Sequence, residues 1–530
     1  MRIAQASIVK RRALGPADVA LPQWLIALAY VLLTAIALYP VFSVDVLPLV
    51  DYPAHLARLH VLTAVDDVPL LAERYAVDWN ILPNLAMDVV VMVLADWLPV
   101  ADALRLFVAV SLVMIVCGCL AVHRALFGSI SLVPGAVFLL LYNHVLIFGF
   151  INYLFGVGLY LLVFAAWIAA RRWPAWCRVL LFSVASVALF FAHLFAFGIY
   201  GLSVCAYELW HTMRSRAQPR PAAVRSWSVA LAQFSIPVAL WAASPTGGRN
   251  TYIAYGEFKD KLLALFSPVW AYGELIDQVI FVFVGILLVR GLFGGALRIA
   301  PELRYPLLAL LLAAIVMPSW LLGVWGVDFR LPLVLACLVA AGSRVELPDV
   351  RIGAAVVAAG LVLVGVRIWT ISESWRGYDA QYSEFRHASE AIDPGARLLV
   401  VQDVRDEGFS TAYWHVAALA VIDRSVFLPT LFTDRTAQPV HVTAAYEAID
   451  TPFGSPITPK LLRIGADPDK AARLAGARLP TGERIYWANW PKNFDFLLYV
   501  HFGTGVNPMP ERLRRVHAGS FFDIYRIVRD

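Results

Sequence analysis

The sequence predicts a polytopic α-helical membrane protein that ends in a small soluble α/β domain. Hydrophobic residues make up 60% of the 530 residues and charged residues only 15%, a balance far from that of a soluble protein. About eleven apolar segments follow one another up to residue 371, and residues 372–530 have an ordinary composition. We therefore expect a transmembrane domain, 1–371, and a C-terminal domain, 372–530.

The apolar segments define the expected spans. Several are shorter than the roughly 20 residues that a straight span requires, so their ends are approximate. The segments are Trp24–Val44, Leu104–His123, Leu132–Phe150, Leu154–Ala170, Val179–His193, Phe195–Trp210, Val229–Ala243, Val279–Leu292, Leu307–Trp325, Leu331–Ala341 and Ile352–Ile371.

Basic residues predict the orientation, because Lys and Arg collect in cytoplasmic loops. The N-terminal tail carries Arg2, Lys10, Arg11 and Arg12, and every second loop after it is also rich in arginine. This alternation places the N-terminus in the cytoplasm of a bacterium and the chain in its inner membrane. The first loop (44–103), the loop 244–277 and the C-terminal domain then face the periplasm or cell exterior.

Two parts of this outer material have recognisable patterns. Leu85–Pro99 is apolar but contains Asp88 and Asp96, eight residues apart, and we expect an amphipathic helix on the membrane surface with both on one face. The C-terminal domain has strand-like segments and two candidate helices but no phosphate-binding glycine motif. The strands are expected at Arg397–Gln402, Phe494–Val500 and Phe521–Val528, and the helices at Tyr413–Val421 and Lys470–Ala477.

The stretch from Asp45 to Arg58 directly follows the first span and gathers ionisable residues near the membrane surface, where charge is costly and often functional. Pro53 suits a helix start, and Asp51 is placed to cap that helix. Residues three and four apart share a helix face, so Asp51, His55 and Arg58 would lie together. The alternative is an ordinary helix start with a capping Asp51 and solvated neighbours.

Polar residues also cluster at the outer ends of the spans. On the side where Asp51 lies, several such groups at one depth predict a shared cavity that opens outward. The alternatives are hydrogen bonds between helices and, for Asp328 and Arg330, a mutual ion pair. The cavity candidates are Asn143, His144, Asn152, His193 and Asp328, with Arg330 beside them.

The whole arrangement resembles the GT-C superfamily of integral-membrane glycosyltransferases, which use polyprenyl-phosphate-linked sugars, as in the protein mannosyltransferase and aminoarabinose transferase types. The resemblance implies a glycan, lipid or protein acceptor, contacts with membrane lipids and no nucleic acid. Some members use a divalent cation and others need none, so a metal stays open. The family's first outer loop carries a pair of adjacent carboxylates, whereas Asp51 is followed by Tyr52; one or two carboxylates could act.

Sugar transfer needs a base near the acceptor oxygen and cationic groups near the departing phosphate. We expect Asp51 to be the base, with His55 and Asp45 as further catalytic candidates. Arginine suits a phosphate because it offers bidentate contacts, and Arg330 ranks first because it lies at a span end. The phosphate-binding candidates are Arg58, Arg249, Lys259, Lys261 and Arg330.

Two other function classes fit the same composition. A transporter or flippase for a lipid-linked substrate would also have many spans and polar residues among them, although no internal repeat is evident. A non-catalytic GT-C-like subunit of a polysaccharide assembly system would have the same scaffold, and the missing acidic pair favours it.

Overall fold

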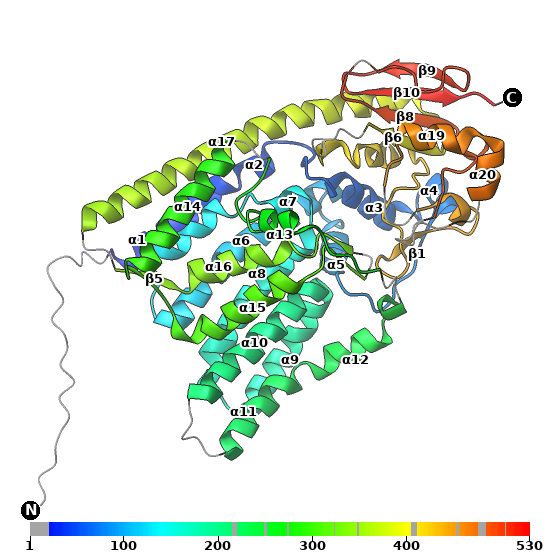
Figure 1. Cartoon of the computed structure of the whole chain (residues 1–530). Coiled ribbons are helices and arrows are strands. Elements are labelled where there is room, and N and C mark those ends of the chain that lie inside the picture. Colours follow the sequence, from blue (N-terminus) through cyan, green and yellow to red (C-terminus); the bar gives the residue numbers. More distant parts are fainter. Residues whose placement is uncertain are drawn as a thin grey trace, which may run out of the picture.

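The protein is described here by a computed structural model. It covers residues 21–529 except 215–219, 249–251, 273–274, 323, 347–348, 404–410, 452–454, 475–476, 478–483 and 504. Figure 1 shows a bundle of helices with the strands of the C-terminal region gathered over one end. The basic tail, Arg2 to Arg12, lies outside the described residues.

The helices of the bundle follow the apolar segments of the sequence. Among the described residues, six stretches are long and apolar enough to cross a membrane: Val100–Phe127 (α6), Ile151–Arg172 (α8, Ile151–Ala169, and η2, Ala170–Arg172), Ala175–Ala192 (α9), Ala223–Ala243 (within α11, Arg220–Ala232, and α12, Ser235–Ala243), Leu275–Phe293 (α14) and Val350–Ala391 (α17, Val350–Ala388, and η5, Ser389–Ala391). The other helices of the bundle are α1 (Gln23–Ala37), α7 (His144–Ile147), α10 (Leu194–Arg214), α13 (Phe258–Ala264), α15 (Arg304–Val316) and α16 (Arg330–Ala341), and η1 (Val133–Leu139), η3 (Pro245–Gly248) and η4 (Pro301–Leu303) are 3-10 turns. The predicted helical membrane protein is confirmed, whereas the count of eleven spans is not established.

Four expected spans are not continuous helices. Trp24–Val44 is divided between α1 and α2 (Tyr39–Phe42), and Val229–Ala243 between α11 and α12. In Leu132–Phe150, the 3-10 turn η1 is followed by the short α7, because Asn143 takes the N-cap position and starts a new helix. In Leu307–Trp325, α15 ends at Val316, one residue before Met317-Pro318, and the hairpin β3 (Trp320–Leu321) and β4 (Val324–Trp325) follows. A residue before proline disfavours the helical conformation, which accounts for this end.

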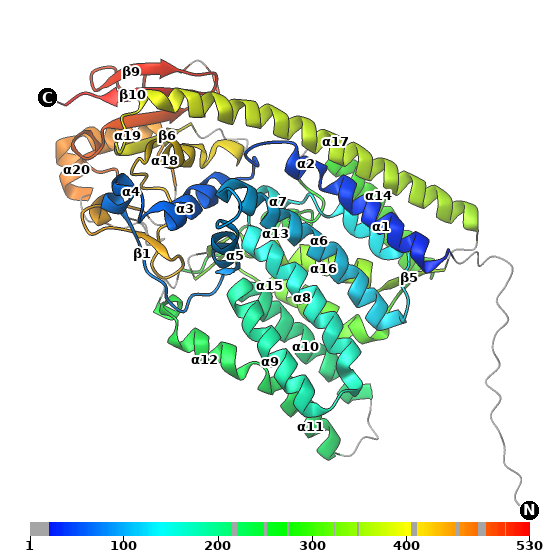
Figure 2. The same ribbon diagram turned by 180° about the vertical axis from the view of Figure 1, so that it is seen from behind.

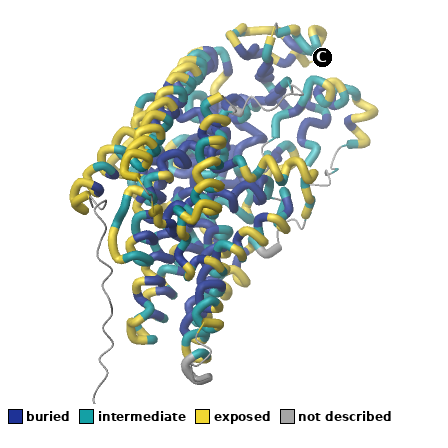
Figure 3. Tube along the Cα trace, turned by 60° about the vertical axis from the view of Figure 1, so that its left-hand side comes forward, coloured by how far each residue is buried: buried dark blue, intermediate teal, exposed yellow. Residues whose placement is uncertain are grey.

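Apolar side chains cover the outside of the bundle. Figure 3 shows exposed residues along the long helices and buried residues inside the bundle. On α14, Val282, Ile286 and Val289 are each more than half exposed, and Trp369 on α17 is 63% exposed. Such apolar surface would be costly in water and fits contact with lipid chains.

After α2 (Tyr39–Phe42), which lies at the end of the first expected span, the first outer loop folds into α3 (Tyr52–Ala64), α4 (Pro69–Arg74), β1 (Tyr75–Val77) and α5 (Ala86–Leu94). The helix expected over Leu85–Pro99 is therefore the shorter α5. The expectation that Asp88 and Asp96 share one face is wrong, because α5 ends at Leu94. Asp88 is fully buried, and Asp96 is exposed beyond the end of the helix.

The C-terminal region forms a four-stranded sheet in the order β6-β8-β10-β9. β6 runs parallel to β8, and the other neighbours are antiparallel. The edge strand β9 was not expected, since its polar and mostly exposed side chains show no apolar alternation. The elements are β6 (Leu398–Gln402), η6 (Thr411–Tyr413), η7 (Val416–Ala418), α18 (Leu419–Arg424), η8 (Glu447–Ile449), α19 (Pro459–Ala466), α20 (Pro468–Leu474), α21 (Trp490–Asn493), β8 (Phe496–Val500), β9 (Leu513–Ala518) and β10 (Phe522–Ile527).

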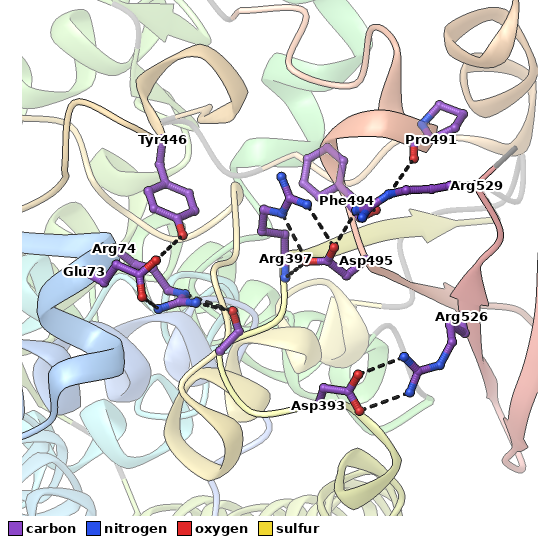
Figure 4. A network of polar contacts seen from close by, with 11 residues as sticks. Glu73, Arg74, Asp393, Arg397, Tyr446, Pro491, Phe494, Asp495, Arg526 and Arg529 are labelled. Carbon is purple, nitrogen blue, oxygen red and sulfur yellow. Dashed lines mark hydrogen bonds and ion pairs between the residues drawn. The ribbon is translucent and has the colours of Figure 1, made fainter.

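The C-terminal region and the first outer loop are joined into one layer, which Figure 2 shows from behind. The predicted boundary at 371/372 falls inside α17, which runs on from the bundle to Ala388. Strand β1 of the first loop pairs with β7 (Val440–Val442), so that Tyr75 lies opposite Val442. Arg74 donates to the carbonyl of Gly395, and nearby ion pairs such as Arg397–Asp495, at 2.9 Å, fasten the sheet (Figure 4). A separate small pairing joins β2 (Leu297–Ile299) to β5 (Ser343–Val345).

Candidate active site

Asp51 lies directly before α3, as predicted, but its side chain does not cap that helix. The backbone fixes its position instead: Asp51 N donates to Phe148 O at 3.1 Å, and Val50 N donates to Ile147 O at 2.9 Å. Gly149 has a φ of +82°, and a Cβ at this position would lie 2.8 Å from Asp51 N. Only glycine fits there without strain, so the loop after α7 holds Asp51 and leaves its carboxylate free of the helix end.

The Asp51 carboxylate is largely buried, and no cationic side chain of the described residues is in contact with it. Its side chain is 18% exposed, and Oδ1 lies 3.6 Å from Nε2 of His415. Burial raises the pKa of Asp51 to about 7, and the positive charge of Arg330 opposes that rise. A carboxyl group with such a pKa is suited to accept a proton near neutral pH.

Two histidines near Asp51, His55 and His415, both pack against the ring of Phe432. The ring centroids of His55 and Phe432 are 5.2 Å apart, and those of His415 and Phe432 are 5.1 Å apart. Burial lowers the pKa of His415 to about 3, and burial together with the nearby charge of Arg58 lowers the pKa of His55. Both imidazoles are therefore neutral at physiological pH.

Arg330 begins α16 and is the other charged group of the site. It is 6% exposed, its guanidinium lies 4.2 Å from the centre of the Phe150 ring, and one Nη donates to the carbonyl of Trp325 at 3.2 Å. Its Nε has no hydrogen-bond partner, and among the described residues no carboxylate lies within ion-pair distance of it. A buried arginine without a counter-ion is costly, which points to an anionic ligand.

The alternative that Asp328 and Arg330 pair with each other is wrong. Asp328 lies 3.5 Å from Nζ of Lys261 on α13, and Lys261 also donates to the carbonyl of Met317. Asp328 further accepts a hydrogen bond from the backbone N–H of Phe329. Asp328 is thus already neutralised by Lys261, and Arg330 keeps its charge for another group.

His193 and His144 lie near Arg330 and contact aromatic side chains of its surroundings. His193 follows α9, accepts from Phe195 N at 3.1 Å, and its ring is 5.2 Å from that of Tyr153, over which Arg330 also lies. The ring of His144 is 5.1 Å from that of Phe329. The aromatic side chains around Arg330 are in mutual contact and form one group, made up of Phe148, Phe150, Trp325 and Phe329.

The side chains of Arg58 and Asp45, in contrast, do not contribute to the candidate site around Asp51 and Arg330. Arg58 is fully buried in a bidentate ion pair with Asp88, so it is not available to a phosphate. Asp45 is exposed, and its segment is held through backbone N–H groups that donate to the carboxylate of Asp379 on α17. The sequence pattern that put Asp51, His55 and Arg58 on one face could not reveal the partner from α5.

Three further candidates, Asn143, Asn152 and Lys259, make contacts only with residues close to them in the structure. Asn143 caps α7 by accepting from Leu146 N at 3.0 Å, and Asn152 binds Met87 N and Asn84 O. Lys259 is 72% exposed and pairs with Glu257. Arg249 lies outside the described residues.

His415 is the functional candidate that the sequence did not indicate, since nothing links this C-terminal histidine to Asp51 before the chain is folded. A metal site also finds no support in the described part of the chain, where no three His, Cys, Asp or Glu side chains are grouped to hold an ion.

Comparison with known proteins adds the fold. No family model and no curated protein matches the sequence. Among solved structures, the chain is similar to ArnT from Cupriavidus metallidurans bound to undecaprenyl phosphate, with a TM-score of 0.50 and 13% sequence identity over 94% of this chain and 98% of that chain. At this identity the likeness shows the fold alone. The chain has the GT-C fold of an integral membrane protein, as the sequence predicted.

Proposed function

We propose that this protein is a membrane glycosyltransferase that moves a sugar from a polyprenyl-phosphate donor to a lipid, glycan or protein acceptor at the outer face of the membrane. One observation carries the proposal: the buried Arg330, which has no counter-ion among the described residues, lies near Asp51, a largely buried carboxylate whose pKa is about 7. The two groups have the opposite charges that the two ends of a glycosyl transfer require.

Asp51 is the base in this reaction. An acceptor hydroxyl gives its proton to the Asp51 carboxylate while the acceptor oxygen bonds to the anomeric carbon of the sugar. The bond from that carbon to the phosphate oxygen breaks, and its electron pair stays on the phosphate. A positioned base contributes about 10²–10⁴-fold to such a step.

Arg330 binds the departing phosphate. Its guanidinium is held by the Trp325 carbonyl and lies over the Phe150 ring, so its place is fixed before the ligand arrives. A preorganised charge of this kind stabilises the negative charge that develops in the transition state. Lys261 offers a second cation close by, once it exchanges Asp328 for the phosphate.

The similarity to ArnT supports the choice of ligand. That protein is bound to undecaprenyl phosphate in its crystal structure, and this chain follows its fold over nearly the whole length. A lipid phosphate meets the need of Arg330 for an anion at the end of an apolar helix. A transporter for the same lipid would share this need, so binding of the lipid does not by itself separate the two functions.

Binding and turnover separate these functions. The full-length protein in lipid nanodiscs should bind undecaprenyl phosphate, and the Arg330→Gln variant should bind it about 10–100-fold more weakly, as expected for a lost charged contact worth about 1.5–3 kcal/mol. Lys259→Gln is the matched control, because Lys259 is exposed and should not matter.

Turnover is measured as release of undecaprenyl phosphate from a panel of undecaprenyl-phosphate hexoses and pentoses in the presence of membrane glycolipids. Release that depends on Asp51 supports the transferase. Movement of the intact lipid across vesicles without release would identify a flippase, and binding without either process a non-catalytic subunit.

A further inference from the structure

The C-terminal region contributes a side chain to the site. His415 lies in the turn between η6 and η7, far along the chain from Asp51, and yet its Nε2 is 3.6 Å from Asp51 Oδ1. The histidine is 4% exposed, and its Nδ1 has no hydrogen-bond partner. A buried polar ring with so few hydrogen-bond partners lowers the stability of the fold. Such a group therefore calls for an explanation, and a role in the active site is one.

The surroundings hold this imidazole against Asp51. Phe432 packs between His415 and His55, and the contacts of α18 and η7 with α3 fix the layer to which all three belong. In the described part of the chain, the charged and titratable groups that face the pair are His55 on α3 and Arg330 on α16, while Arg58 acts on His55. At 3.6 Å the contact is longer than a hydrogen bond, but such contacts often shorten when a substrate binds.

We propose that His415 is the positioning residue for the catalytic carboxylate: its Nε2–H donates to Asp51 Oδ1 and turns Oδ2 toward the acceptor hydroxyl. This inference rests on the proposed function for the role of Asp51 as base. The imidazole remains neutral and transfers no proton itself. The C-terminal region is then a part of the active site and not only a cover over it.

The structure supplies a matched control. His441 on β7 is another buried histidine of the C-terminal region, 4% exposed, and its Nε2 lies 3.4 Å from Asp78 in the first loop. Its Nδ1 also has no partner. Asp78 is 64% exposed and lies outside the site, so loss of His441 tests the same kind of contact without the catalytic carboxylate.

The test compares His415→Leu, His415→Gln and His441→Leu in the full-length protein. Loss of the donor from ionised Asp51 should raise its pKa further, which moves the rising limb of kcat/KM to higher pH and lowers kcat/KM about 10–100-fold, the range found for residues that orient a reacting group. Gln carries an N–H near the position of Nε2, so His415→Gln should stay within about threefold of wild type by the same reasoning. His441→Leu should leave both quantities unchanged.

A second readout does not depend on transfer. Infrared difference spectra, with Asp51→Asn as the reference, follow protonation of Asp51 directly, and the titration should shift upward in His415→Leu and not in His415→Gln. If His415→Leu does not fold, His415→Asn replaces it, because the shorter amide cannot reach Asp51.

The outcomes distinguish the two claims. An Asp51 titration that is the same in wild type and in His415→Leu or His415→Asn, or that shifts equally in His441→Leu, overturns the inference even if the protein transfers sugar. A shift specific to His415 in a protein that transfers no sugar supports the contact and overturns the proposed function.

Discussion

The two ends of the helix bundle treat buried charge in opposite ways. At the end away from the C-terminal region, Glu208 is 1% exposed and accepts hydrogen bonds from Trp167 Nε1 at 3.1 Å and Ser226 Oγ at 2.7 Å. Arg171 and Arg178 lie 3.3 and 3.5 Å from its carboxylate.

At the other end Asp51 and Arg330 are also buried, but neither contacts an opposite charge in the described part of the chain. Glu208 lies about 22 Å along α10 from His193, at 1.5 Å per residue. A carboxylate with four partners stabilises the bundle and has no capacity left for a ligand. A carboxylate and an arginine that are both removed from water without an opposite charge in contact lower the stability of the fold. A ligand that supplies the missing contacts would offset that loss. This contrast supports a structural role for Glu208 and agrees with the proposed site at Asp51 and Arg330.

The largest expected effect is the loss of sugar transfer on substitution of Asp51. Asp51→Asn removes the negative charge that accepts the proton, so transfer should fall about 10²–10⁴-fold, while the protein stays folded because the Asp51 side chain makes no capping hydrogen bond. Turnover of an undecaprenyl-phosphate sugar in nanodiscs measures it. Asp45→Asn is the matched control, since the Asp45 side chain is exposed and should change the rate little. Equal losses of transfer in both variants would contradict the assignment of Asp51 as the catalytic base.

The structural end should respond in stability and not in rate. Glu208→Gln leaves Arg171 and Arg178 without a counter-ion, and breaking a buried ion pair costs about 3–5 kcal/mol. Thermal unfolding in detergent should show a clearly lower Tm, and transfer per folded molecule should be unchanged. A variant of normal stability with lost transfer would mean that the two ends are coupled and that the contrast between them is false.

A sharper version of the comparison lies within the first loop, where Arg58 is paired with Asp88. Asp88→Asn should destabilise the protein, again by up to about 3–5 kcal/mol, because it leaves Arg58 buried and alone. The double variant with Arg58→Met and Asp88→Leu should recover most of that loss. Binding of undecaprenyl phosphate, measured by titration, should be the same in wild type and the double variant; weaker binding would return Arg58 to the phosphate site.

The smallest expected effect is a pH dependence of stability. The folded-state pKa of Asp51 is about 7, above its ordinary value of 3.8. The stability from this group is therefore fully present below pH 3.8 and is lost as the pH rises through 7. The Asp51→Asn variant cannot ionise, so its Tm should gain on that of wild type between about pH 5 and 8. A constant difference in Tm over this range would argue against a raised pKa.

The sequence was sufficient for the class of fold and for choosing Asp51 and Arg330 as candidates, which the folded chain brings near each other. Composition and the basic loops gave a helical membrane protein, and the position of Asp51 and Arg330 at the ends of apolar segments singled them out. Periodicity within one segment could not show that Asp88 forms an ion pair with Arg58, that Lys261 forms one with Asp328, or that His415 lies beside Asp51. These are contacts between distant segments, which depend on the packing of the whole chain.

The most direct test of the account is a structure of the protein with undecaprenyl phosphate bound. We expect the phosphate oxygens within hydrogen-bond distance of the Arg330 guanidinium, close to Asp51 and between the C-terminal layer and the bundle. The same structure of Arg330→Gln should lack the lipid at this position. A phosphate bound elsewhere, with Arg330 still unpaired in the complex, would contradict the assignment of this end of the bundle as the active site.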